Sequence, residues 1–158
     1  MKTIKHQIEI DCDQETVFDL SQDYSRRLDW DPYLSKAYLL KGAEKAGLGV
    51  ESCCRNRSGS EMITRYISFK RPRVAAVTMV KGPWFLKRFG GAWNVSKLSE
   101  TRSSLVFTYN FQMRGGLLGY SLLPFAIFFF SREMKSRLFA IKRYLESDFD
   151  ERREAPLS

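Results

Sequence analysis

Residues 103–148 decide the fold: SSLVFTYNFQM (103–113) leads through RGG (114–116) into LLGYSLLPFAIFFFSREMKSRLFAIKRYLESD (117–148). From Leu105 to Met113 every second residue is large and apolar, which predicts a strand with one buried face. In the second half of the longer segment, apolar residues recur at i, i+4, i+7 and i+11 and predict an amphipathic helix. They are Met134, Leu138, Ile141 and Leu145. The strand face and the helix stripe are expected to bury each other.

Upstream of this stretch, short extended runs are separated by turn residues, which is typical of an antiparallel meander. The expected strands are 36–42, 48–57, 61–70, 73–82, 86–99 and 103–113. Residues 4–10 predict a seventh strand, because apolar residues alternate there with polar ones.

Two short helices are expected between the first strand and the meander. Asp11 or Asp13 offers an N-cap for the first helix. The second follows Asp23 and ends near Asp31, because Pro32 disfavours the helical conformation in the residue before it. The element order is therefore βααββββββα, an α+β fold in which a curved antiparallel sheet of about seven strands wraps around a long C-terminal helix. A sheet of that size twists, and the space left under the helix is the candidate pocket.

Length and composition limit the alternatives. The 158 residues suffice for one domain; we expect it to span 1–149, with 150–158 as a disordered tail. Three cysteines and a single histidine argue against a disulfide framework or a metal site, so no metal and no cofactor are expected. The N-terminus lacks an apolar secretory segment, which favours a cytoplasmic location.

The chain resembles the START-like or Bet v 1-like helix-grip superfamily (SRPBCC), particularly its bacterial polyketide cyclase/dehydrase-like members. The resemblance covers nearly the whole chain. It rests on VFDL (17–20), DY (23–24), LDWDP (28–32), GAW (91–93) and the C-terminal helix. It implies an internal cavity between the sheet and that helix, which accommodates a hydrophobic molecule such as a lipid, sterol, quinone or polyketide.

The candidate ligand-binding residues are those whose apolar or aromatic side chains should face this cavity. They are Trp30, Tyr66, Trp93, Phe107, Tyr109, Phe111, Met134 and Leu138. The same side chains could equally form ordinary core, because aromatic rings bury large areas wherever they can. No catalytic residue is assigned, since the sequence has no nucleophile motif and no phosphate loop.

Several polar residues have a structural and a functional interpretation. Asp29 and Asp31 flank Trp30, and we expect solvated or capping acids rather than a cooperating pair. His6 is expected to be a hydrogen-bonded interior or edge residue. Cys53 and Cys54 are adjacent in a predicted strand, so only one of their side chains can face the core.

Three functions compete. The sequence favours a protein that binds or transports a small hydrophobic molecule over an enzyme. By resemblance, the first alternative is an aromatase/cyclase in which His6, Tyr66 or Tyr109 polarises a carbonyl. The second is an interaction protein whose basic region, Arg65 to Lys97, meets an anionic partner such as a ribosome or a membrane. The net charge is +8 and no acidic residue lies between Glu61 and Glu100, but no nucleic-acid motif is present.

The block Leu117–Phe130, which contains Gly119 and Pro124, is expected to be separate from the amphipathic helix that follows it. As a helix, this block of 14 residues would span only about 21 Å. A transmembrane helix needs roughly 20 residues, so the block is too short to cross a membrane. Its consecutive apolar residues cover every side of a helix, so we expect a mobile or partly exposed element beside the pocket mouth. It would form a homodimer or rest peripherally on a membrane; alternatively, the sheet edge and N-terminal helices enclose it.

Overall fold

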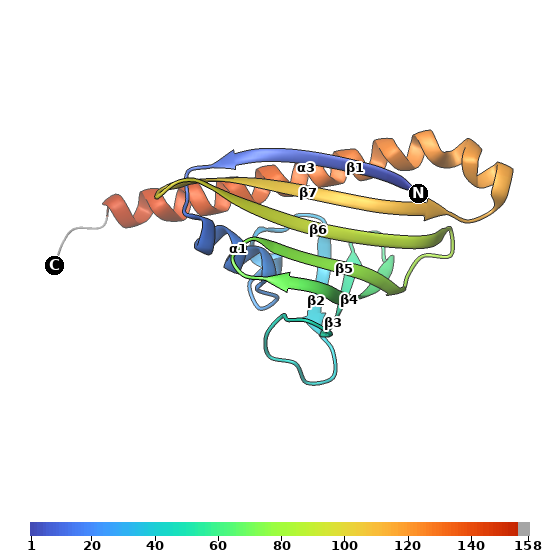
Figure 1. Cartoon of the computed structure of the whole chain (residues 1–158), viewed down its shortest axis with the longest axis horizontal. Helices are drawn as coiled ribbons and strands as arrows, with labels where there is room; N and C mark the ends of the chain where they lie inside the picture. Colours follow the sequence, from blue (N-terminus) through green and yellow to red (C-terminus); the bar gives the residue numbers. More distant parts are fainter. Residues whose placement is uncertain (155–158) are drawn as a thin grey trace.

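The computed structural model describes residues 1–154 and has the expected order of elements (Figure 1). These are β1 (Lys2–Ile10), α1 (Gln14–Gln22), α2 (Arg27–Trp30), β2 (Leu34–Leu39), β3 (Glu51–Asn56), β4 (Glu61–Lys70), β5 (Val74–Lys81), β6 (Leu86–Ser99), β7 (Arg102–Met113) and α3 (Gly116–Glu154). Asp13 is the N-cap of α1, and its side chain accepts a hydrogen bond from the backbone N–H of Thr16 at 3.0 Å. The tail expected from residue 150 lies partly within α3, and residues 155–158 lie outside the described residues.

The seven strands form one antiparallel sheet in the order β1-β7-β6-β5-β4-β3-β2, so the prediction of a curled seven-stranded sheet with a long C-terminal helix is confirmed. The strands β4 and β6 begin and end at the residues expected from the sequence, and the others differ by a few residues. Only β1 departs from the chain order, since it closes the sheet beside β7 at one edge. The sheet curls away from α3 toward β2 and β3 (Figure 1).

Helix α3 packs on β1 and β7 at one side of the sheet. The stripe predicted from the sequence faces the strands, and Met134, Leu138, Ile141 and Leu145 are all buried. Their partners across the interface include Ile4 and Leu105, also buried. Helix α1 packs on β6 and β7, and α2 packs on β2. Because α3 packs on β1 and β7, part of the concave face of the other strands is left open beneath it.

The expectation that Leu117–Phe130 is separate from the amphipathic helix is wrong, because α3 is continuous from Gly116 to Glu154. Pro124 removes one backbone donor and leaves the carbonyl of Tyr120 without its helical partner. Both residues are exposed, so water can satisfy that carbonyl. An inward stripe keeps the helix in place across the proline. Its members are Leu123, Ala126, Ile127 and Phe130, which pack against the core.

The start of α3 is joined tightly to the end of the sheet. Gly115 and Gly116 adopt positive φ angles, and a Cβ at Gly119 would collide with the carbonyl oxygen of Arg114. The backbone N–H of Arg114 donates to the carbonyl oxygen of Phe85 at 2.7 Å. This hydrogen bond holds the β5–β6 loop beside the first turn of α3.

Candidate ligand-binding cavity

A cavity of about 400 Å³ lies between the concave face of the sheet and α3. Strands β3 to β7 and the turns between them supply most of its wall; the end of α1, the segment from Tyr24 to Leu34 and α3 supply the rest. Ser58 and Phe129 are the exposed residues on this wall. The cavity therefore meets solvent between the first half of α3 and the β3–β4 turn.

Four of the eight predicted ligand-binding residues line the cavity: Tyr66, Trp93, Phe107 and Tyr109. The rings of Trp93 and Phe107 stack with their centroids 3.8 Å apart, and Tyr109 packs edge-on against Phe107 at 4.8 Å. These rings come from neighbouring positions of β6 and β7, since Trp93 pairs with Phe107 in the ladder. They form a rigid aromatic floor.

The other four predicted residues do not line the cavity. Met134 and Leu138 point from α3 onto the sheet where the two are in direct contact, and Phe111 packs edge-on against Phe130. Trp30 packs edge-on against Trp93 at 6.3 Å and lies behind the wall. All four are buried, and at Phe111, Met134 and Leu138 the reason is that α3 and the sheet are in direct contact.

A buried network of charged side chains forms one side of the cavity. Asp31 accepts hydrogen bonds through Oδ2 from Nε of Arg27 at 2.9 Å and from Nε of Arg137 at 3.0 Å. Arg137 also donates through Nη1 to Tyr109 at 2.7 Å and to Glu133 at 2.9 Å. The hydroxyl of Tyr109 donates to the same Glu133 oxygen at 3.0 Å. Apart from Asp31, every member of this network lies on the cavity wall.

The expectation that Asp31 is solvated is therefore wrong, whereas the capping part holds, because Oδ1 of Asp31 accepts a hydrogen bond from the backbone N–H of Tyr33 at 3.1 Å. The residue surface of Asp31 is 2% exposed, whereas Asp29 is exposed as expected. Burial alone would raise the pKa of Asp31, but the guanidinium groups of Arg137 and Arg27 outweigh it and lower the pKa below its ordinary value. Asp31 thus stays ionised between two buried cations.

The pKa of Glu133 is shifted in the opposite direction from that of Asp31. Burial raises the pKa of the Glu133 carboxyl group, and the hydrogen bonds from Arg137 and Tyr109 offset this only in part. Burial also raises the pKa of Tyr109, so its hydroxyl keeps its proton and remains a donor. Arg27 and Arg137 both lie on this wall of the cavity, and their guanidinium groups favour an oxygen acceptor on a ligand.

A second polar group, made of neutral side chains, lies where β3 and β4 meet the end of α1. Tyr66 donates through its hydroxyl to Oε1 of Gln22 at 2.7 Å, and Tyr24 donates to Oγ of Ser52 at 2.9 Å. Oγ of Ser52 lies 3.0 Å from Oγ1 of Thr64. These hydroxyls bond to one another, which lets them sit in the interior without a large desolvation cost.

Arg27, Glu133 and Arg137 were not predicted as site residues, although the sequence contains a local signal for the charged network. Arg27 and Asp31 are four residues apart, and so are Glu133 and Arg137, the spacing of helical ion pairs. Arg137 also directly precedes Leu138 of the buried stripe. Nothing local shows that the two pairs meet, because Asp31 and Arg137 are 106 positions apart in the chain.

His6 lies away from the cavity. Its Nε2 atom is hydrogen-bonded to Oγ of Ser131 on α3, and the residue is half-buried, as the structural interpretation expected. Burial and the nearby charge of Lys135 lower the pKa of its imidazole. The carbonyl-polarising role considered for His6 therefore has no geometric support. Among the side chains that the structure describes (residues 1–147 and 151), no cluster of histidine, cysteine, aspartate or glutamate has the arrangement of a metal site.

Cys54 provides a chemical probe of the cavity. It lines the wall, and burial raises the pKa of its thiol, so little reactive thiolate forms at neutral pH. Cys53 and Cys12 are buried. We expect slow native labelling by Ellman's reagent, removed by Cys54→Ser, and complete labelling after unfolding. Rapid labelling of the native protein, or slow labelling that persists in Cys54→Ser, would contradict this placement.

Comparisons with known proteins agree with the geometry. The family model described as "polyketide cyclase / dehydrase and lipid transport" matches residues 1–146. The search of curated proteins gave no significant match. Among solved structures, the Zhui aromatase/cyclase from Streptomyces sp. R1128 aligns with a TM-score of 0.76 and 17% identity, over 92% of this chain and 93% of that one.

Two further structures extend the comparison. A START superfamily protein from Mycobacterium smegmatis aligns with a TM-score of 0.76 and 10% identity, over 92% of this chain and 97% of that one. Norcoclaurine synthase from Thalictrum flavum, in complex with dopamine and hydroxybenzaldehyde, aligns with a TM-score of 0.71 and 12% identity, over 92% and 87%. At these identities the likeness shows the fold. The match to the family model over almost the entire length shows more: the chain belongs to the polyketide cyclase / dehydrase and lipid transport family.

Proposed function

We propose that this protein binds one small, largely apolar molecule that carries an oxygen-bearing polar group, enclosed between the sheet and α3. The observation that carries the proposal is the cavity itself, an aromatic-walled space of about 400 Å³ with two hydrogen-bonding groups in its wall. Small-ligand pockets typically measure about 300–1,000 Å³ and combine apolar walls with a few convergent polar groups.

The walls suggest how such a ligand would lie. Its apolar body would rest on the aromatic floor of Trp93, Phe107 and Tyr109. Its polar oxygen would face either the Arg27–Arg137 side or the hydroxyls of Tyr24 and Tyr66, all of which line the cavity. A carbonyl or carboxylate fits the arginine side, because guanidinium groups are hydrogen-bond donors only. A hydroxyl fits either group, because the two tyrosines already donate their own protons within the protein and keep acceptor lone pairs. Lipids, quinones and polyketides share this chemistry.

A blocking substitution tests the proposal. Gly91 lines the cavity in extended backbone, and a Cβ there would touch Tyr109 and Val77 at an ordinary 3.7 Å. We expect Gly91→Leu to fill the space and weaken binding of the fluorescent probe anilinonaphthalene sulfonate by about tenfold or more, since an occupied cavity cannot enclose a ring. The measurement is a fluorescence titration.

Ala92→Leu is the matched control, because the next residue of β6 points to the other face of the sheet. It should bind the probe like the wild type. Native mass spectrometry of protein purified from its own host, followed by extraction, would identify a retained molecule. Equal probe binding by wild type and Gly91→Leu would contradict the proposal.

One observation favours catalysis as a second candidate. The carboxyl group of Glu133 lies in the cavity wall with a raised pKa, beside the hydroxyl of Tyr109. In a dehydrating cyclisation, Glu133 could protonate the hydroxyl that leaves as water and then take up a proton from the neighbouring carbon. Mass spectrometry of the extracted molecule, incubated with wild type and Glu133→Gln, distinguishes the two. Loss of one water with the wild type alone indicates an enzyme, and an unchanged mass with both indicates a binding protein.

A further inference from the structure

The first half of α3 exposes an unusually apolar surface at one end of the molecule. The stripe opposite the inward one is exposed along its length, with Phe125 at 64% and its neighbour Phe128 at 60%. Trp84 is 80% exposed and lies in the β5–β6 loop, which is hydrogen-bonded through Phe85 to Arg114, just before α3. We define the aromatic surface as Trp84, Leu118, Leu122, Phe125, Phe128 and Phe129. Soluble proteins rarely leave this many large apolar side chains together in water.

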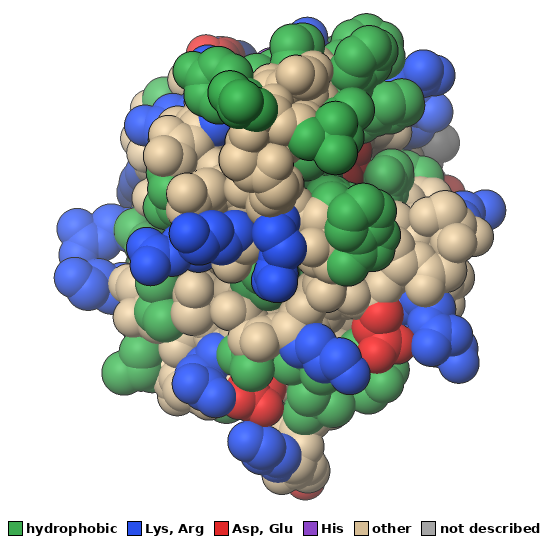
Figure 2. Space-filling model, turned by 90° about the vertical axis from the view of Figure 1, so that its right-hand side faces the viewer, with side chains coloured by type: hydrophobic (Ala, Val, Ile, Leu, Met, Phe, Trp, Pro, Cys, Tyr) green, Lys and Arg blue, Asp and Glu red, His purple; other side chains and the backbone are tan. Residues whose placement is uncertain are grey.

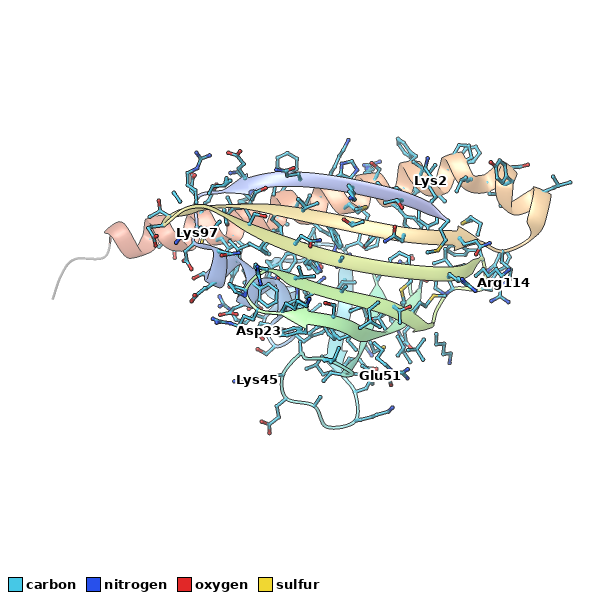
Figure 3. All side chains as sticks on the ribbon, viewed as in Figure 1. Lys2, Asp23, Lys45, Glu51, Lys97 and Arg114 are labelled. Atoms are coloured by element: carbon cyan, nitrogen blue, oxygen red, sulfur yellow. The ribbon has the colours of Figure 1, made fainter. Side chains whose placement is uncertain are left out.

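The aromatic surface is bordered by basic side chains. We define the basic rim as Lys81, Lys87, Arg88, Arg114 and Arg132, all of them exposed. Figure 2 shows hydrophobic side chains gathered at the top of this end of the molecule, with a band of Lys and Arg beneath them. Arg114 lies at this end, whereas Lys97 lies at the opposite end (Figure 3).

The basic rim is also unneutralised. Within the described part of the chain, none of its five members forms an ion pair, whereas Arg65, Arg71 and Lys97 are paired with Glu51, Asp19 and Glu100. Between Glu61 and Glu133 the sequence contains a single acidic residue, Glu100. Glu61, near the cavity opening, is itself paired with Arg55. The positive charge of the rim is therefore free to attract an anionic partner.

From this combination we infer that the aromatic surface and basic rim dock on an anionic phospholipid bilayer. Interfacial helices bury an apolar face at the headgroup boundary, with Lys and Arg beside it contacting lipid phosphates. The arrangement here matches, because α3 projects its first turns past the strand ends, where nothing shields them from a flat surface (Figure 1). A second copy of the chain is a poorer partner, since it would bring two basic rims together.

The surface also lies beside the opening of the cavity. Phe129 belongs to both, and Phe85, the neighbour of Trp84, lines the cavity wall. A docked molecule would thus turn its opening toward the lipid. By length and composition, Gly116–Ser147 of α3 could cross a membrane; since its second half is packed on the sheet, docking uses the first half only.

Vesicle co-sedimentation tests this inference. We expect the wild type to bind vesicles of equal parts phosphatidylserine and phosphatidylcholine, and to bind phosphatidylcholine vesicles much more weakly. Phe125→Gln/Phe128→Gln should weaken binding at least about tenfold, because two exposed rings no longer enter the interface. Phe139→Gln is the matched control, since Phe139 lies farther along the same helix and is 61% exposed. It should bind like the wild type.

A second pair of variants tests the charge. Lys81→Gln/Arg88→Gln should weaken binding to the anionic vesicles by about fivefold per charge, and added salt should reduce the difference. Lys36→Gln/Lys45→Gln removes two exposed lysines outside the basic rim and should leave binding to the anionic vesicles unchanged. Lys81→Gln/Arg88→Gln and its control keep the test valid if Phe125→Gln/Phe128→Gln fails to fold. Gly91→Leu should still bind vesicles, so failure of the ligand proposal leaves this one intact.

Three results would overturn the inference: no binding to anionic vesicles, equal binding by the wild type and Phe125→Gln/Phe128→Gln, or no loss in Lys81→Gln/Arg88→Gln. Analytical ultracentrifugation tests the alternative that a second copy of the chain binds the aromatic surface. A wild-type dimer that Phe125→Gln/Phe128→Gln dissociates, together with absent vesicle binding, would assign the surface to a second copy of the chain.

Discussion

Asp31→Asn is expected to lower the free energy of unfolding by about 3–5 kcal/mol, because it removes the shared counter-charge of two buried arginines. Asn keeps the size of the side chain but leaves Arg27 without its ion pair and Arg137 with Glu133 alone. Urea denaturation followed by far-UV circular dichroism measures the loss. Asp29→Asn is the control, since Asp29 is exposed, and should change stability by no more than about 0.5 kcal/mol.

The free energy of unfolding of the wild type should also depend on pH through Asp31. The pKa of Asp31 is lower in the folded protein than in the unfolded chain, where it is about 3.9. Its ionised form therefore stabilises the fold fully above that value, and this stabilisation is lost as the pH falls through the lowered folded pKa. The stability difference between the wild type and Asp31→Asn should be constant near neutral pH and shrink in acid. A difference that grows on acidification would contradict the ion-pair assignment.

Phe111→Ala should cost about 3–5 kcal/mol of unfolding free energy, as for other fully buried phenylalanines. Phe111 has no exposed surface and packs between β7 and α3 against Phe130, so truncation leaves a void that the rigid strand cannot close. Phe128→Ala, on the exposed side of α3, should cost less than about 1 kcal/mol. Chemical denaturation of both variants compares them directly. A similar cost for the two would show that the first half of α3 is covered in solution.

The fold was predictable because its signals are local. Alternation in 105–113 and the stripe from Met134 to Leu145 each define one buried face, and two such faces have few ways to cover each other. The extent of α3 was not predictable in this way. Pro124 disfavours a helix locally, but Leu123, Ala126, Ile127 and Phe130 pack inward on both sides of it, and this tertiary packing outweighs the lost hydrogen bond.

The cavity was predictable in kind but only in part by residue. Phe107, Tyr109 and Phe111 follow one another on the same face of β7, yet only the first two reach the open space. The difference depends on where α3 touches the sheet, which alternation cannot show. Periodicity reports that a side chain is buried, and the curl of the sheet decides whether it faces a ligand or another side chain.

The charged network depended most on tertiary structure. Asp29 and Asp31 are the same residue type two positions apart, and their local sequence gives no reason to separate them. Folding brings Arg137 of α3 to Asp31 and leaves Asp29 in water. By itself the sequence determined the strands, the helix stripe and the apolar excess of 117–130, because these depend on neighbours along the chain. Which acid is buried, which ring faces the cavity and which phenylalanines stay exposed were decided only by contacts between segments far apart in sequence.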